Sequence, residues 1–189
     1  MKYHPERHHR RSIRLKGFNY ASEAFYFVTL CSYQRQCLFG TIIDGEVQLN
    51  EFGEIVAAEW MRTSDIRPNI SLDEWVVMPN HIHGIISIRQ TVSTPDATLS
   101  EAAQGCTSLQ GGIAYRRPKL LSSLVSGFKL ATTKQINIRR NAAGTPVWQR
   151  NYYERIMRDE NALVRVQRYI QNNPSKWQED RLRPAIMNS

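Results

Sequence analysis

The chain of 189 residues has few cysteines and no long apolar segment. Its three cysteines, Cys31, Cys37 and Cys106, are an odd number without CxxC spacing, which argues against a disulfide framework and a four-cysteine zinc site. No apolar run approaches the roughly 20 residues that a membrane helix needs. The basic stretch 1–15 also lacks an apolar segment of signal-peptide length. We therefore expect a cytoplasmic protein with reduced thiols.

Acidic residues are scarce at both ends of the chain, whose net charge is +8. Residues 1–20 contain six Lys or Arg and one acidic residue, and residues 116–189 contain fifteen and five. The middle, residues 21–115, reverses the balance with four basic and eleven acidic residues. A basic surface formed by the two ends is typical of a protein that binds a polyanion. We expect nucleic acid as the partner, and the alternative is a charge that serves solubility alone.

Apolar patterning and turn signals predict an alternation of strands and helices. The expected strands cover residues 25–31, 41–43, 46–49, 70–78, 81–88 and 147–157. The expected helices run from a cap at Asn50 to about Arg62, from about Leu120 to the segment before Gly144, and from Asp159 to Pro174. This order predicts an α+β fold, with a ferredoxin-like antiparallel sheet covered by helices.

The composition also divides the chain into segments. Residues 1–17 are expected to form a basic amino-terminal arm, and residues 18–178 a single domain. Within that domain, residues 90–117 are rich in Ser, Thr, Gly, Ala and Gln, which is typical of a flexible insert. Residues 179–189 are expected to be a tail.

Two histidines stand one residue apart in an expected strand. His81 and His83 occupy alternate positions, which point to the same face about 6.5–7 Å apart along the backbone. Ile82 between them is expected to face a core, and Gly84 allows a close approach by another element. Two imidazoles on one rigid face can bind a single metal ion. The alternative is a pair of ordinary half-exposed histidines.

The last expected helix carries a second group of polar residues. Tyr169 and Asn173 are four residues apart and hence neighbours on one helix face. A tyrosine can act as a nucleophile, and an asparagine can offer a carbonyl oxygen to a metal. Arg165 and Arg168 flank the tyrosine and could bind phosphate or lower the pKa of its phenol. The alternative is a tyrosine at the helix edge and an asparagine that ends the helix before Pro174.

Several stretches, taken together, resemble a known family. Residues 78–84, Met-Pro-Asn-His-Ile-His-Gly, resemble the HUH motif (histidine, bulky apolar residue, histidine) of single-strand DNA nucleases with one catalytic tyrosine. Residues 147–160 and 169–174 resemble the carboxy-terminal signature of REP-associated tyrosine transposases. These are bacterial relatives of the small insertion-sequence transposases that move single strands. Residues 11–18 and 26–29 are also similar to that family.

Outside the insert, the resemblance covers most of residues 11–177, and it implies a mechanism. His81 and His83 would hold one Mg²⁺ or Mn²⁺ ion, and Asn173 matches the position of a third, amide-type ligand. Tyr169, on the carboxy-terminal helix, would attack the phosphorus, forming a 5′-phosphotyrosine link and releasing a 3′-hydroxyl. A 3′-hydroxyl can reverse this step and join strands, so the implied activity is metal-dependent DNA transposition.

Two other tyrosines compete for the role of nucleophile. Tyr152 and Tyr153 lie in the preceding expected strand, where they are interpreted as core or DNA-stacking residues. Tyr169 is preferred because the family motif places the nucleophile before Ile-x-x-Asn-Pro, four residues ahead of the amide ligand.

The resemblance also assigns a task to the basic ends of the chain. The candidate phosphate contacts are Arg10, Arg11, Arg14, Lys16, Arg150, Arg155, Arg158, Arg165 and Arg168. Family members recognise imperfect hairpins formed by palindromic repeats, so we expect single-stranded DNA hairpins as partners. We also expect a nucleoid-associated cytoplasmic location and a monomer or a homodimer.

Two further interpretations stay open. The first is a catalytically silent DNA- or RNA-binding regulator of the same fold. The second is a zinc-stabilised structural domain, which the spacing of the cysteines does not favour. Metal preference in an assay for a covalent protein–DNA adduct separates the zinc interpretation from a strand transferase.

Overall fold

The computed structural model describes residues 24–89 and 119–184. Its strands are β1 (Ala24–Cys31), β2 (Gly40–Ile43), β3 (Glu46–Leu49), β4 (Ile70–Met78), β5 (His81–Ile88) and β6 (Tyr153–Ile156). Its helices are α1 (Glu51–Ile66), α2 (Lys119–Arg139) and α3 (Glu160–Gln171), with short 3-10 turns at Tyr33–Arg35 and Trp177–Glu179. The expected basic arm, with Arg10, Arg11, Arg14 and Lys16, and the expected insert at 90–117 lie outside the described residues.

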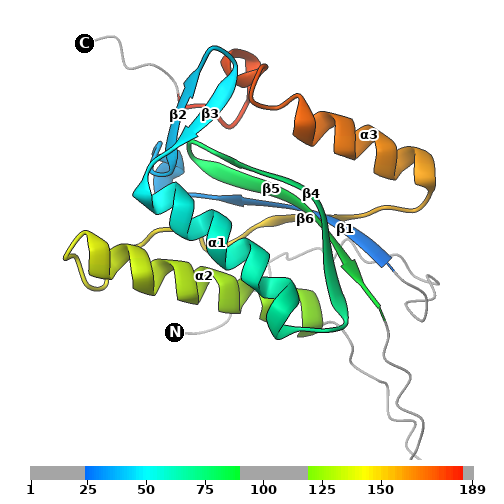
Figure 1. The fold of residues 1–189 in the computed structure, drawn as a ribbon, viewed down its shortest axis with the longest axis horizontal. Helices are drawn as coiled ribbons and strands as arrows, with labels where there is room; N and C mark the ends of the chain where they lie inside the picture. Colours follow the sequence, from blue (N-terminus) through cyan, green and yellow to red (C-terminus); the bar gives the residue numbers. More distant parts are fainter. Residues whose placement is uncertain (1–23, 90–118, 185–189) are drawn as a thin grey trace, which may run out of the picture.

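Four strands form one antiparallel sheet in the order β4-β5-β1-β6, and β2 and β3 form a separate hairpin. The chain order β1, α1, β4, β5, α2, β6 with this strand order is the ferredoxin-like arrangement, which confirms the predicted fold class. Helices α1 and α2 cover one face of the sheet, and α3 lies on the other (Figure 1). No described helix is long and apolar enough to cross a membrane.

Strand alternation sorts the side chains of the sheet into two cores. Val28, Leu30 and Ile82 are buried on the face covered by α1 and α2. Phe27 and Ile85, one residue out of phase, are buried against α3. The prediction that Ile82 faces a core is confirmed. Because strand positions alternate, His81 and His83, on either side of Ile82, face α3.

Two predicted boundaries differ from the structure. Helix α1 continues to Ile66 rather than ending near Arg62, because Thr63 is still buried against the core. The last strand is only Tyr153–Ile156 instead of 147–157. The preceding segment pairs with the end of β1 only through an isolated bridge between Ser32 and Trp148. Beyond it, the carbonyls of Gln149 and Asn151 accept hydrogen bonds from the Lys129 ammonium of α2.

Helix α1 packs directly onto the backbone of β5 at Gly84. A Cβ atom there would lie 2.3 Å from Cζ2 of the fully buried Trp60. We expect Gly84→Ala to lower the free energy of unfolding by about 1–3 kcal/mol, because the core is already filled. Urea unfolding measures this change in the free energy of unfolding. The control is Gly127→Ala in α2, where the added Cβ meets only Arg67 Nη2 at 3.5 Å; equal destabilisation of both variants would contradict the packing argument.

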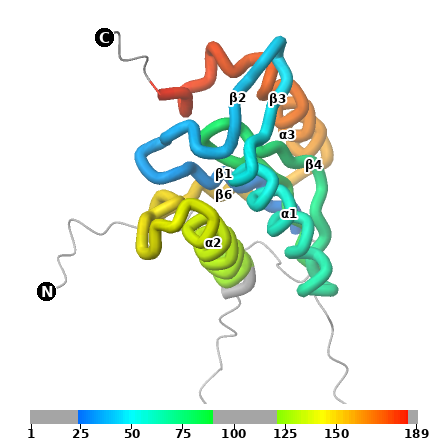
Figure 2. The backbone as a smooth tube through the Cα atoms, turned by 60° about the vertical axis from the view of Figure 1, so that its left-hand side comes forward, coloured from blue at the N-terminus to red at the C-terminus, as the bar shows by residue number. Residues whose placement is uncertain are grey.

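The hairpin β2–β3 reaches the segment that follows α3, and the two lie side by side in Figure 2. A Cβ atom at Gly45, in the hairpin turn, would lie 3.5 Å from Cα of Ser175. The hairpin therefore supports the carboxy-terminal segment at the end of the sheet where β4 turns into β5.

Candidate active site

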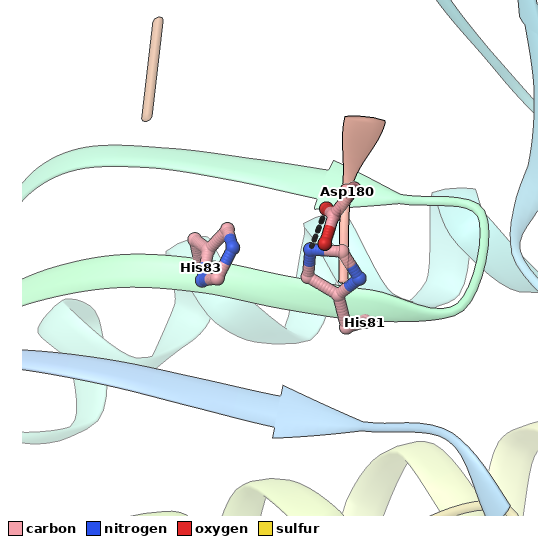
Figure 3. A group of neighbouring side chains, drawn as sticks. All are labelled: His81, His83 and Asp180. Atoms are coloured by element: carbon pink, nitrogen blue, oxygen red, sulfur yellow. Dashed lines mark ion pairs between the residues drawn. The ribbon is translucent and has the colours of Figure 1, made fainter. Parts of the chain in front are cut away.

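Two histidines of β5 form the base of the site. His81 and His83 point to the face that α3 covers, and their relative exposures are 0% and 2% (Figure 3). Their ring centroids are 4.4 Å apart. Strand β5 is paired on both sides, with β4 and β1, so the two imidazoles stand on a rigid platform.

A buried asparagine determines which ring nitrogen of His81 carries the proton. Asn80 Nδ2 donates to the carbonyls of Arg35 at 3.1 Å and Leu182 at 2.7 Å. Its Oδ1 must therefore accept, and it lies 2.7 Å from His81 Nδ1. The proton of the neutral ring is on Nδ1, and Nε2 presents a lone pair to the face covered by α3.

His83 also has a polar neighbour at each ring nitrogen. Its Nδ1 lies 2.8 Å from Thr29 Oγ1, which belongs to the paired position on β1. Its Nε2 lies 3.2 Å from the phenol oxygen of Tyr169. The Nε2 atom of His83 therefore faces the predicted nucleophile on α3.

Burial keeps both imidazoles in the neutral, metal-binding form. The pKa of His81 falls to about 4 mainly because of burial, against the opposing effects of Asp180 and Asn173. Burial, and secondarily His81, holds the pKa of His83 well below its ordinary value. A metal can bind a neutral imidazole without displacing a proton. The site is thus prepared for a cation at neutral pH.

The pKa of the Tyr169 phenol is raised, first by burial and then by the Asp180 carboxylate, while a hydrogen bond from Asn173 opposes the shift. The interpretation that Arg165 and Arg168 lower this pKa is therefore wrong in the described structure, where neither is among the causes of the shift. Both arginines are exposed, so water screens their charge. The phenol stays protonated at neutral pH without a bound cation.

A bulge in β4 holds α3 in position over the histidines. The pairing of β4 with β5 shifts between Leu72 and Trp75. Both carboxylate oxygens of Asp73, in this bulge, accept from Gln167 Nε2, at 3.0 and 3.1 Å. Glu74 accepts from Gln171 Nε2 at 2.9 Å. These contacts lie on either side of Tyr169 along the helix and hold the part of α3 that carries it against β4.

The structure brings the predicted site residues together and adds one more. Asn173 is 5% exposed, next to Tyr169 and His81. Asp180 Oδ2 lies 3.6 Å from His81 Nε2, and its side chain is 6% exposed. Ligand atoms of His81, His83 and Asp180 all lie within 4.8 Å of one another (Figure 3). Asp180 belongs to the stretch that sequence patterning separates as a tail, and only its acidity in a basic region marks it.

The three tyrosines are well separated in the fold. Tyr152 packs against the core on the opposite face of the sheet, and its hydroxyl donates to Glu154 at 2.8 Å. Tyr153 is 49% exposed and contacts the edge of Phe27, as Tyr169 also does. Tyr169 is the one that contacts the histidine pair: its ring centroid lies 5.2 Å from that of His83.

Basic side chains lie around Tyr169. Arg165 and Arg168 line a hollow of about 510 Å³ together with Tyr169 and Asn173. Lys176 and Arg181, which sequence patterning does not single out, line it too. The other described candidate phosphate contacts, Arg150, Arg155 and Arg158, are exposed and do not line this hollow.

Comparison with known proteins identifies relatives of the chain. A protein of Haemophilus influenzae, described only as uncharacterized, is 42% identical over 181 residues, which cover 96% of this chain and 97% of that protein. The chain belongs to the same family as this protein. No model of a known protein family matches the chain.

A solved structure, of a REP-associated tyrosine transposase bound to a REP hairpin, covers 87% of this chain and 74% of that one. The TM-score is 0.52 and the identity is 17%. The chain has the fold of a REP-associated tyrosine transposase, as its sequence motifs predict. A candidate transposase of Deinococcus radiodurans R1 aligns over 84% of this chain and 97% of that one, at 15% identity and a TM-score of 0.44.

Within this transposase fold, the buried polar atoms fit a bound cation. Among the described residues, four buried side-chain nitrogen or oxygen atoms have no hydrogen-bond partner. Three of them, His81 Nε2, Asn173 Oδ1 and Asp180 Oδ2, belong to this one cluster. All three are electron-pair donors, and a buried donor without a partner is costly. Imidazole, amide and carboxylate donors together suit a divalent metal ion.

Proposed function

We propose that the chain is a metal-dependent enzyme that cleaves and rejoins single-stranded DNA through a covalent link to Tyr169. The observation that carries this proposal is the 3.2 Å distance between the phenol oxygen of Tyr169 and Nε2 of His83. The nucleophile thereby meets a cluster of buried, unpaired donor atoms at one point. A scissile phosphate placed at this point would contact both the Tyr169 phenol and an ion held by the donor atoms.

His81 and His83 would hold Mg²⁺ or Mn²⁺ through Nε2, and Asn173 through Oδ1. The bound ion supplies Lewis acidity, which polarises the scissile phosphate. Asn80 keeps the proton of His81 on Nδ1, and Thr29 Oγ1 would accept the Nδ1 proton of His83, so that both Nε2 atoms stay available. Supporting hydrogen bonds of this kind raise the basicity of the ligand and fix the orientation of its ring.

Tyr169 would form a bond from its phenol oxygen to phosphorus as the bond from phosphorus to the 3′ oxygen breaks. The phenol loses its proton, the departing oxygen gains one as a 3′-hydroxyl, and the 5′ side stays on the enzyme. Because the phosphodiester is exchanged rather than hydrolysed, a 3′-hydroxyl can attack the link and restore a strand. Arg165 and Arg168 would bind neighbouring phosphates in the hollow beside Tyr169.

Hairpins of palindromic repeats are the proposed substrate, acted on in the cytoplasm beside the nucleoid. The solved transposase with this fold is described as bound to a REP hairpin, which supports this choice. Arg150, Arg155 and Arg158 are exposed and free to contact phosphates outside the hollow. Within the single proposed domain of residues 18–178 and its arm, Arg10, Arg11, Arg14 and Lys16 would add further contacts.

A cleavage assay tests the proposal. The protein is incubated with 5′- and 3′-labelled single-stranded hairpins from the DNA flanking its own gene, with Mg²⁺, Mn²⁺ or chelator, and resolved on a denaturing gel. We expect metal-dependent cleavage and a protein–DNA band that survives denaturation. Hairpin binding without cleavage or adduct, with both metals and both strands, would favour the silent regulator instead.

A further inference from the structure

We propose that Asp180 is a ligand of the same metal ion as His81 and His83, so that the ion joins the carboxy-terminal segment to the sheet. This inference rests on the proposed metal-dependent function and adds to it an anionic ligand from outside the motifs of β5 and α3. It is carried by the hydrogen-bond network around His81 and by the position of the Asp180 carboxylate.

The first step is the identity of the two facing atoms. Asn80 accepts the Nδ1 proton of His81, since its own Nδ2 is committed to two backbone carbonyls. The neutral ring therefore has no proton on Nε2. Asp180 Oδ2 lies 3.6 Å from this Nε2, and neither atom has a hydrogen-bond partner. Two lone pairs face each other in a buried place.

The second step is what can occupy the space between them. Two unpaired acceptors repel unless a cation lies between them, and a buried carboxylate oxygen without a partner is costly. Donor atoms that share one ion at about 2.0–2.3 Å lie at most about 4.6 Å apart. The donors of His81, His83 and Asp180 lie within 4.8 Å of one another, so small shifts bring all three onto one ion.

The third step is how Asp180 is held. The turn at Trp177–Glu179 places Trp177 in the interior, with its ring centroid 6.3 Å from that of His81. Beyond Asp180, the Leu182 carbonyl accepts from Asn80, and the Leu182 amide donates to Asp180 Oδ1 at 2.7 Å. One carboxylate oxygen is thereby satisfied and the other is directed at the histidines. The residues on both sides of Asp180 thus hold it against β5.

The chemistry suggests which ion is favoured. A carboxylate adds a negative charge and an oxygen donor to two imidazoles and an amide, which suits Mn²⁺ and Mg²⁺ better than a purely nitrogen site does. The chain also gains a link between β5 and the segment after α3. Metal binding would then stabilise that segment as well as prepare the phosphate site.

The test is Mn²⁺ binding by the full chain without DNA, followed by electron paramagnetic resonance of the free ion. We compare wild type, Asp180→Asn, His83→Ala as the ligand-loss reference, and Glu179→Gln. The last is the matched control, since it removes the same charge from an exposed neighbouring residue. We expect Asp180→Asn to raise the Kd at least about 10-fold, and Glu179→Gln to change it less than about 3-fold.

Thermal unfolding in chelator gives a second readout. Asp180→Asn is expected to weaken Mn²⁺ binding but to stabilise the metal-free protein. An asparagine at 180 can donate a proton to His81 Nε2, so we expect the metal-free Asp180→Asn variant to melt about 2–4 °C higher than wild type. Its stabilisation by Mn²⁺ should be lost. A simple ion pair between a protonated His81 and Asp180 predicts a lower Tm instead, and that result would overturn the inference.

The outcomes separate this inference from the proposed function. If Asp180→Asn binds Mn²⁺ as tightly as wild type while His83→Ala loses binding, Asp180 is not a ligand. The proposed enzyme function would be unaffected by that result. No binding by wild type would overturn the metal site altogether. Mn²⁺ binding that depends on Asp180, in a protein that never cleaves hairpins, would uphold the ligand assignment and refute the enzyme.

Discussion

Replacing Tyr169 with phenylalanine is expected to abolish the covalent protein–DNA adduct and to lower hairpin cleavage by at least about 10³-fold. The variant lacks the proposed nucleophilic oxygen, and water in its place lacks the positioning that the helix gives to the phenol. The side chain is 47% exposed, and its hydroxyl lies 3.2 Å from Nε2 of His83. Folding and hairpin binding should therefore be preserved. A denaturing gel measures the loss of adduct and cleavage, and a binding titration measures the retained affinity for the hairpin.

The fold supplies a matched control for this variant. Tyr153 is exposed to nearly the same extent, 49%, and its ring centroid lies 6.1 Å from that of Phe27, the same distance as for Tyr169. Tyr153→Phe therefore removes a hydroxyl from an equivalent setting without a histidine contact, and it should retain the adduct. An adduct that survives Tyr169→Phe and disappears in Tyr153→Phe would leave the enzyme class in place and move the nucleophile to β6.

Local patterns predicted the parts of the fold whose signals lie within one element. The bounds of β4 and β5 match the prediction, because Pro79 and Asn80 form the tight turn between them. The two histidines share a face for the same local reason, since strand positions alternate. The hairpin around Asp44 and Gly45 follows from its turn residues, which both have positive φ.

The contacts that prepare the site were not predictable, since they join residues far apart in the chain. Asn80 reaches the Leu182 carbonyl across 102 positions, and Gln167 reaches Asp73 across 94. No spacing rule encodes such pairs, and the bulge at Asp73 depends on how β4 pairs with β5. Asp180 was missed for this reason. Tyr169 and Asn173 were found through periodicity and family resemblance, and their roles stay predictions.

The described network also explains how one site can combine a protonated phenol with neutral imidazoles. Burial raises the pKa of Tyr169 and lowers that of His83, so both groups are uncharged at neutral pH. A cation at the Nε2 atoms would favour the phenolate electrostatically, whereas without one the phenol stays protonated. The predicted nucleophile is thus expected to become reactive only in the metal-bound enzyme.

Replacing His83 with alanine is expected to lower metal-dependent cleavage by about 10³-fold or more while leaving hairpin affinity within about 3-fold. The reason is that Lewis-acid stabilisation by a bound ion is worth several kcal/mol, and each 1.36 kcal/mol is a factor of ten in rate. The basic residues that line the hollow, Arg165 and Arg168 among them, are untouched by this change. Single-turnover cleavage and a binding titration in chelator measure the two quantities separately.

A graded variant makes this prediction sharper. Thr29→Val keeps the shape of the side chain but removes the hydroxyl that lies 2.8 Å from His83 Nδ1. It should weaken metal affinity by about 10–100-fold, because the imidazole remains but its orientation and basicity lose support. Cleavage by Thr29→Val should then recover at high Mn²⁺ concentration, whereas cleavage by His83→Ala should not. Recovery of both to the wild-type rate would mean that His83 is not a required ligand, and that the ion acts through His81, Asn173 and Asp180.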